Sequence, residues 1–422
     1  MKKVALSLAG VLAAAAFAPE ASALPTFARQ TNSACSACHF QHFPLLNSFG
    51  RAFKAGAYTM TATSKVEGEH LSIPSNLNFG ALITAGYEKE SNNFSNIFVP
   101  GAGGEMQLFW GGRINDFSGF LSEFGTTGPA GGSGKVLILP EVAGDTRAGV
   151  AVFSIGQGPQ GAFELLNTGA TTIHRLMGNQ GTSQQHNQAA TAGQYVASEK
   201  LYALGGGSGA ALVVVNPNMG ALTVAKFIDA GAGVGGGTAT VGLPFQYIRA
   251  VALFDLAGFD TGVGIQNFSG STADVFGARS YRATIVDAQM QGEMAGMPVG
   301  IYASYGTAPV NAANPNGFNN GTAVNLGGPV GGVGTKSSFN IAGELGVIPG
   351  HATVQAGLRF GNSGGAAGSN TDNAVMVGAT YELSQNQELT LHYTSQSGSA
   401  WTALGAAAVG KTNMTLLLET LF

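Results

Sequence analysis

The chain has 422 residues, of which only 10% are charged, and its formal net charge is −4. A soluble domain carries about 25% charged residues, and no basic tract indicates a nucleic-acid partner. The chain has 65 glycines and, beyond its N-terminal stretch, no apolar run long enough for a spanning helix. These features leave two classes for a hydrophobic exported chain, a transmembrane β-barrel or a glycine-rich β-solenoid.

Residues 1–23 have the pattern of a secretory signal peptide. A charged start, an apolar stretch and a small-residue cleavage site follow one another at Lys2-Lys3, Val4–Phe17 and Ala21-Ser22-Ala23. The apolar stretch is shorter than the roughly 20 residues that a spanning helix needs. We therefore expect it to be removed rather than kept as an anchor.

The segment Cys35-Ser36-Ala37-Cys38-His39 carries C-x-x-C-H, the attachment signature of a c-type haem. Two thiols three positions apart can form thioethers to the haem vinyl groups, and His39 then binds the iron as the proximal ligand. A zinc site would need more ligands, and the chain has no other cysteine. A redox C-x-x-C pair would not need the histidine. The motif therefore predicts one covalent haem c held by Cys35, Cys38 and His39, which agrees with export.

Residues 24–74 are expected to form a monohaem cytochrome c module and its linker. The stretch Pro44–Lys54 is predicted to be a short helix, in which Leu45, Phe49 and Phe53 form one apolar stripe. That stripe suits the face of a haem, and it equally suits ordinary core packing. A unit this small does not easily build an independent core, so we expect the module to depend on the haem and on the rest of the chain.

The sixth ligand of the haem iron is left open by the sequence. Met60 and His70 lie far enough along the chain to fold back, and a methionine would raise the reduction potential. His42 follows His39 by only three residues, so geometry disfavours it on the opposite side of the iron. The ligand is otherwise a residue of a barrel strand, or the position is open. Three basic residues are candidates for pairing with the haem propionates or are solvated surface charges: Arg29, Arg51 and Lys54.

From residue 75 to 422 the pattern changes to strands in which apolar and polar residues alternate. Val354, Ala356 and Leu358 alternate with Gln355 and Arg359, for example. Combined with so few charges, this is the apolar-out, polar-in pattern of a lipid-embedded barrel. Several charged or titratable residues should then face the lumen: Glu344, Arg359, Glu382, Glu388 and His392. Their carboxylates suit Fe²⁺, although polar lumens are lined with such groups in any case.

Connections alternate between tight turns and long loops, as in outer-membrane barrels. Tight turns are predicted at Asn115-Asp116, 143–146, Pro349-Gly350 and 384–387, and long loops at 90–103, 127–133, 308–336, 361–372 and 395–411. Segment 157–194 is predicted to be a long external or infolded loop, with Phe163–Leu176 moderately helical and able to form a constriction.

The strand-like segments number about 17 by alternation, but directions counted from the two ends conflict between residues 195 and 229. Because both ends of such a sheet should face the same side, we predict an all-β transmembrane barrel of about 16 antiparallel strands. A barrel of that size has room in its lumen for a small plug.

The module resembles the N-terminus of the fused outer-membrane monohaem cytochrome c–porin family. The shared residues lie between 27 and 58, namely Phe27-Ala28-Arg29-Gln30-Thr31, Cys35-x-x-Cys38-His39, Pro44-x-Leu46-Asn47-x-Phe49-Gly50-Arg51-x-Phe53-Lys54 and Gly56-x-Tyr58. Ala57 and His42 depart mildly from the usual pattern. The best-known members are extracellular iron(II) oxidases. The resemblance implies that the haem plugs the lumen of a Gram-negative outer-membrane barrel, with the N-terminus in the periplasm or the lumen.

The function that this resemblance implies is an electron conduit across outer-membrane lipid. One electron passes from extracellular Fe(II) or another reductant through haem c to a periplasmic cytochrome or copper protein. As an enzyme, the chain would be an iron(II):cytochrome c-type oxidoreductase. Two further functions stay open: a diffusion porin with a structural or regulatory haem, and a haem-bearing sensor or adhesin that uses the long loops.

Overall fold

A computed structural model gives the fold. It describes residues 25–69, 71–76, 78–91, 95–125, 132–156, 158–169, 191–198, 201, 206–229, 243–274, 277–311, 316–319, 332–400 and 411–422. The predicted signal peptide lies outside the described residues. Within them, no helix is both long enough and apolar enough to cross a membrane.

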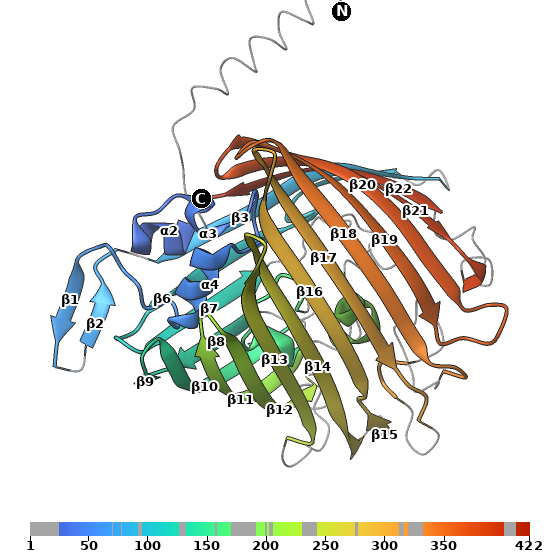
Figure 1. Cartoon of the computed structure of the whole chain (residues 1–422), viewed down its shortest axis with the longest axis horizontal. Coiled ribbons are helices and arrows are strands. Elements are labelled where there is room, and N and C mark those ends of the chain that lie inside the picture. Colours follow the sequence, from blue (N-terminus) through green and yellow to red (C-terminus); the bar gives the residue numbers. More distant parts are fainter. Residues whose placement is uncertain are drawn as a thin grey trace, which may run out of the picture.

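A closed β-barrel makes up most of the molecule (Figure 1). It begins at β3 (Phe79–Glu90) and ends at β22 (Thr412–Leu421), and these two strands pair antiparallel to close the sheet. Three barrel strands are interrupted, so that β4–β6, β8–β9 and β15–β16 each act as one strand. The predicted barrel of 16 antiparallel strands is thus confirmed.

The remaining barrel strands are β4 (Ser95–Pro100), β5 (Gly103–Gly104), β6 (Met106–Arg113), β7 (Ser118–Gly125), β8 (Ser133–Ile138), β9 (Glu141–Ala143), β10 (Thr146–Ile155), β11 (Gly207–Asn216), β12 (Gly220–Asp229), β13 (Phe245–Leu256), β14 (Phe259–Asp274), β15 (Gly277–Ser280), β16 (Ala283–Met294), β17 (Met297–Ala308), β18 (Lys336–Ile348), β19 (Ala352–Ser363), β20 (Thr371–Ser384) and β21 (Gln387–Ser397).

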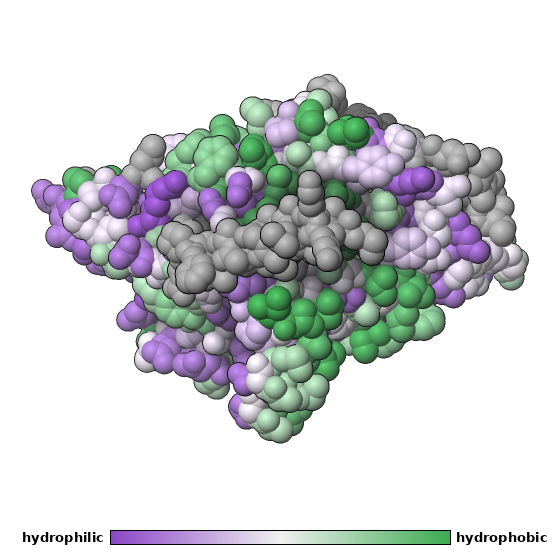
Figure 2. Space-filling model, turned by 90° about the horizontal axis from the view of Figure 1, so that it is seen from above, coloured by the Kyte–Doolittle hydropathy of each residue, from purple (hydrophilic) through white to green (hydrophobic). Residues whose placement is uncertain are grey.

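The two faces of the sheet differ as the alternation predicts. On β21, Leu391 and Tyr393 are exposed on the outside, whereas His392 and Thr394 are buried on the inside. Of the side chains predicted to face the lumen, four are buried and Glu382 is half-buried. Figure 2 shows most of the apolar residues between the left and right ends of the view, where polar residues gather.

Tight turns gather at one end of the barrel and long connections at the other. Asn115-Asp116, Gly144-Asp145 and Gln385-Asn386 each join two adjacent strands, as predicted. The prediction for 90–103 was wrong in part, because β4 lies inside it and extends the pairing with β3, and β5 begins at its last residue. The predicted loops at 127–133 and 395–411 fall partly outside the described residues.

Among its described residues, the region in which the strand directions conflicted contains no strand before β11. Residues Gln194–Ser198 form a single π-helical turn, η3, whose side chains are mostly buried in the lumen. Tyr195 and Val196 pack there with apolar residues of the inner wall. The extra strand-like segment is therefore part of a connection that folds inward.

Three short helices form the N-terminal module, α2 (Pro25–Thr31), α3 (Cys35–Cys38) and α4 (Ser48–Ala55). They lie at the tight-turn end of the barrel, beside the C-terminus (Figure 1). The linker forms a two-stranded hairpin outside the barrel, β1 (Lys65–Gly68) and β2 (Leu71–Pro74), which the sequence analysis did not predict.

The helix predicted from Pro44 begins four residues later. Leu46 pairs with His39 in an isolated β-bridge, and the Asn47 side chain caps α4 by accepting from the Gly50 N–H at 3.0 Å. The predicted apolar stripe was therefore wrong. Leu45 lies outside the helix and is fully buried, whereas Phe49 is 39% exposed.

Candidate haem site at the mouth of the barrel

The C-x-x-C-H segment is held by a small hairpin that it forms with residues 45–47. Cys35 and Cys38 lie on α3, and the His39 N–H donates to the Cys35 carbonyl at 2.9 Å. The Phe40 N–H donates to the Leu45 carbonyl at 2.8 Å, and the Asn47 N–H donates to the Cys38 carbonyl at 3.0 Å. These backbone hydrogen bonds thus fix the conformation of the motif without help from a cofactor.

Asn47 and Gly50 explain why the start of α4 lies directly against the motif. The Asn47 amide donates to the Ala37 carbonyl at 3.1 Å. A Cβ added at Gly50 would lie 2.2 Å from the Cys38 carbonyl oxygen, a distance that no side chain tolerates. Only glycine permits this approach.

The His39 ring is oriented as an iron ligand requires. Its Nδ1 lies 3.1 Å from the Leu45 carbonyl oxygen, so that Nδ1 carries the proton. With the proton on Nδ1, the lone pair of Nε2 is left for a metal. Burial lowers the pKa of His39 to about 4, which keeps the imidazole neutral, the form that binds metals.

The two thiols lie in surroundings that favour thioethers over thiolates. Both cysteines are free of a disulfide. Burial, together with the carboxylates of Glu382 and Glu388, raises the pKa of Cys35, and burial raises the pKa of Cys38. Zinc binding and thiol redox chemistry both need thiolates, whereas a thioether carries no charge. The residues therefore fit a covalently attached haem better than a zinc or dithiol site.

The candidates for the sixth ligand are not brought to His39. Met60 is 44% exposed and lines a 480 Å³ pocket at the rim with Arg113, Glu141 and Arg147. The lining of that pocket includes none of the residues of the haem motif. His70 lies outside the described residues. Among those described, no group of three His, Cys, Asp or Glu side chains is placed to hold a metal ion.

Two of the three basic residues proposed for the propionates are committed elsewhere. Arg51 is buried and pairs with Asp260 of β14, and its Nη1 lies 3.4 Å from Gln291. The Arg29 guanidinium donates to the Phe79 carbonyl. Burial lowers the pKa of Lys54, with the carboxylate of Glu164 acting in the opposite direction.

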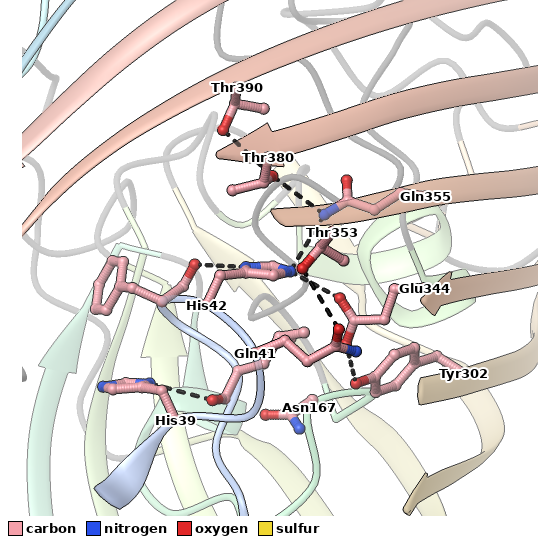
Figure 3. Close-up of polar contacts among 12 residues, drawn as sticks. His39, Gln41, His42, Asn167, Tyr302, Glu344, Thr353, Gln355, Thr380 and Thr390 are labelled. Carbon is pink, nitrogen blue, oxygen red and sulfur yellow. Dashed lines mark hydrogen bonds and ion pairs between the residues drawn. The ribbon is translucent and has the colours of Figure 1, made fainter. Parts of the chain in front are cut away.

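His42 ties the module to the opposite wall of the barrel (Figure 3). Its Nε2 lies 2.7 Å from Glu344 of β18 and its Nδ1 lies 2.9 Å from the Phe43 carbonyl oxygen. The other oxygen of Glu344 accepts from the Tyr302 hydroxyl at 2.8 Å. Burial alone would lower the pKa of His42, but the carboxylate of Glu344, assisted by Glu388, raises it to about 9. Nε2 thus docks the module to the wall, while Nδ1 is held by a carbonyl within the module.

The inner wall is shaped to accept the module. Cβ atoms added at Gly119 and Gly346 would lie 2.1 Å from the Ala57 carbonyl oxygen and 2.4 Å from the Gln41 amide oxygen. Phe43 packs against an apolar patch of the inner wall that contains Leu82, Phe109 and Leu421. This patch explains why Leu82 interrupts the polar side of β3.

The other part of the lumen contains an infolded segment, residues 158–169. Phe163, Leu165 and Leu166 are buried against aromatic side chains of the inner wall. The prediction of a helix over Phe163–Leu176 was wrong for its described part, because only a 3₁₀ turn, η1 (Pro159–Gly161), precedes irregular backbone. Of the two alternatives predicted for this connection, external or infolded, the described residues take the infolded one.

The residues that join the module, the segment and the wall were not predictable from the sequence. Glu344 was expected in the lumen, but nothing predicted its contact with His42, which lies 302 positions away. Asn167, whose side chain bonds the backbone of Leu46, carries no local signal, and neither do the glycines of the inner wall. Their roles depend on the strand register and on how the module docks.

The fold and the docked motif define a class: a porin-like β-barrel with a small helical module in its tight-turn mouth. A scan against protein-family models and a search of curated proteins find no match. Among solved structures, a porin is similar with a TM-score of 0.52 and 10% identity, over 82% of this chain and 100% of the porin. OmpT from the outer membrane of Vibrio cholerae is similar with a TM-score of 0.45 and 9% identity, over 85% and 100%. At these identities the likeness concerns the fold alone, and the resemblance to the cytochrome–porins stays a prediction.

Proposed function

We propose that the chain is an outer-membrane barrel. Its outer face carries exposed apolar and aromatic side chains such as Trp110, Phe360 and Tyr393, which suits contact with lipid. Closure between β22 and β3 leaves no unpaired strand edge, as a lipid environment demands. The porin likeness supports the same placement through the fold.

We propose further that Cys35, Cys38 and His39 hold one covalent haem c at the tight-turn mouth. When bound, this group supplies a site that takes up and gives up one electron. His39 would bind the iron through Nε2, and the Leu45 carbonyl keeps its ring oriented. The observation that carries the proposal is this preset histidine beside two free thiols, inside the mouth of a closed barrel.

The function that follows is electron transfer across the membrane. An electron cannot cross about 30 Å of hydrocarbon unaided, so a redox site enclosed by the barrel is needed. A donor on the loop side, Fe(II) or another reductant, reaches the site through the lumen. A soluble cytochrome or copper protein collects the electron at the tight-turn side, which we take as periplasmic because outer-membrane barrels place short turns there.

The first test is a haem-stained gel of outer membranes from cells that produce the native chain or Cys38→Ala. The native band should stain and the variant band should lose most of its stain while the barrel stays in the membrane. Fe(II) should then reduce the purified native protein, and a periplasmic acceptor should re-oxidise it. An unstained native band would rule out the haem proposal.

A second candidate is a diffusion porin with a structural or regulatory haem, and the porin likeness favours it. Solute permeability separates the two functions. The module and the infolded segment both occupy the lumen, and a conduit can keep it closed to solutes, whereas a diffusion porin must let them pass. Liposomes that contain the native protein should leak small sugars slowly if the barrel is a conduit. Fast sugar entry together with a haem that Fe(II) does not reduce would favour the porin.

A further inference from the structure

We propose that Asn167, on the infolded segment, is a positioning residue for the proximal histidine, so that the barrel completes the haem site of the module. This inference rests on the proposed haem function. It concerns a residue that lies 128 positions after His39 and belongs to a different part of the fold. The connection between the two begins at the backbone of Leu46.

Leu46 lies opposite His39 in their antiparallel bridge. The two hydrogen bonds that frame this bridge come from Phe40 and Asn47, so the N–H and C=O of Leu46 point away from the motif. Buried backbone groups need partners. The Asn167 side chain supplies both partners, accepting from the Leu46 N–H at 2.9 Å and donating to the Leu46 carbonyl at 3.0 Å.

The neighbouring residue, Leu45, carries the oxygen that orients His39. That oxygen accepts from the Phe40 N–H and lies 3.1 Å from Nδ1 of His39. Asn167 therefore acts one peptide away from the group that sets the tautomer and tilt of the ring. A shift of Leu46 moves this oxygen because the two residues share a peptide plane.

Asn167 is itself held by the barrel wall. Its N–H donates to Gln289 of β16 at 2.6 Å, and the next residue, Thr168, donates to Asp287 at 2.6 Å. Asp287 accepts in turn from Arg249 at 2.5 Å. The chain of contacts runs from the wall through the segment to the carbonyl beside His39, as a rigid support for a metal ligand requires.

The direction of the effect follows from ligand chemistry. A hydrogen bond from Nδ1 to a carbonyl makes the imidazole a stronger electron donor, and a stronger donor favours the oxidised iron. Loss of Asn167 should weaken that bond and raise the midpoint potential. Mutation of a residue that supports a metal ligand typically changes metal affinity or activity by about tenfold or more. We expect a change of the same size in the redox equilibrium, and tenfold in a one-electron equilibrium corresponds to about 59 mV.

The experiment is a spectroelectrochemical titration of the full-length, haem-loaded protein in detergent. Asn167→Ala should raise the midpoint potential by about 59 mV, which corresponds to a tenfold change in the one-electron equilibrium constant. Gln289→Leu removes the acceptor for the Asn167 N–H without adding charge and should shift the potential less, in the same direction. Asn319→Ala is the matched control, because its buried amide donates to the carbonyls of Ala308 and Gly334 in the loop region.

The outcomes separate the two proposals. A raised potential in Asn167→Ala, with Asn319→Ala at the native value, supports the inference. Native potentials in both variants, with haem attached, overturn the inference and leave the proposed function standing. If Asn167→Ala yields no folded barrel, Gln289→Leu decides: a raised potential supports the inference and an unchanged one overturns it. A native protein without haem overturns the proposed function instead.

Discussion

Gly50 sets how closely α4 approaches the haem motif. The backbone of α4 at Gly50 lies against the Cys38 carbonyl. The Asn47 side-chain amide holds the start of α4 beside the motif by donating to the Ala37 carbonyl. The contact joins the two halves of a module that is too small to have a large core of its own. A single methyl group at this point therefore acts on the geometry of the haem motif.

We predict that Gly50→Ala lowers haem attachment and the stability of the module. Its Cβ would lie 2.2 Å from the Cys38 oxygen, and overpacking of this kind costs about 1–3 kcal/mol. Haem staining per barrel and the urea midpoint of the haem absorbance measure the effect. The control is Gly343→Ala, whose Cβ would meet only the Gly300 carbonyl oxygen at 3.6 Å. Equal values for the two variants would contradict the prediction.

The His42–Glu344 pair makes docking of the module dependent on pH. The folded pKa of His42 is raised from 6.5 to about 9, so its contribution is complete below pH 6.5 and is lost as the pH rises through about 9. At about 1.4 kcal/mol per pH unit, the loss is at most about 3–4 kcal/mol. The titratable groups that interact with this site are Glu344, Glu382 and Glu388 from the wall and His39 from the module.

Proteolysis of the linker at pH 6.5, 8 and 9.5 measures this dependence. Cleavage of the native chain should accelerate toward alkaline pH, whereas His42→Gln should show little change beyond that of the protease itself. His351→Gln, in an exposed tight turn, serves as the control and should follow the native profile. A His42→Gln profile identical to the native one would refute the role of this pair.

At the residue scale, the sequence predicted local chemistry and missed long-range partners. Cys35, Cys38 and His39 carry their signature in five consecutive positions, and lumen-facing residues follow from the alternation within one strand. The partner of His42 depends on which strand lies opposite the module. Neither periodicity nor spacing contains that information, because it arises only when a closed barrel meets a docked module.

At the scale of elements, the strands were predictable and the irregular segments were not. Alternation over ten or more residues identifies strands such as β19 and β21 with little ambiguity. The start of α4 was misplaced because the pairing of Leu46 with His39 competes with helix formation. The infolded segment 158–169 has no period at all, since its shape is set by the wall that it covers.

A buried ionic cluster fastens that segment to the wall. Arg249 of β13 donates to Asp287 at 2.5 Å and to Glu164 of the segment at 3.0 Å, and all three side chains are buried. Removing one partner from such a cluster leaves buried charge without compensation, which costs about 3–5 kcal/mol. The cluster thus stabilises the attachment of the segment to the wall only while all three charged side chains are present.

We predict that Arg249→Met releases the segment and raises the ion conductance of the barrel in planar bilayers. The triple variant Arg249→Met, Glu164→Gln and Asp287→Asn removes the uncompensated charges and should recover most of the native conductance. Limited proteolysis within the segment should follow the same order. A single variant that conducts like the native protein would show that the segment is held by its apolar contacts instead.

At the scale of the whole molecule, the strand ladder of the barrel is complete without the plug. The ladder closes through β22 and β3, and none of its described strands comes from the module. The module contributes side-chain contacts that include Arg51 with Asp260, His42 with Glu344, and Phe43 with the apolar patch. The sheet should therefore survive loss of the plug, at the cost of exposing that patch to water.

We predict that deletion of residues 25–60 leaves a folded, heat-modifiable barrel whose single-channel conductance exceeds that of the full-length protein. The increase arises because the deleted residues occupy the tight-turn mouth, where Leu82, Phe109 and Leu421 face the lumen. The double variant His42→Gln, Arg51→Gln keeps the chain length but removes the ion pairs of the module with Glu344 and Asp260. Its conductance should alternate between the full-length and the deletion levels. If the deletion variant conducts no better than the full-length protein, the infolded segment rather than the module closes the lumen, and the haem would then lie outside the path of solutes.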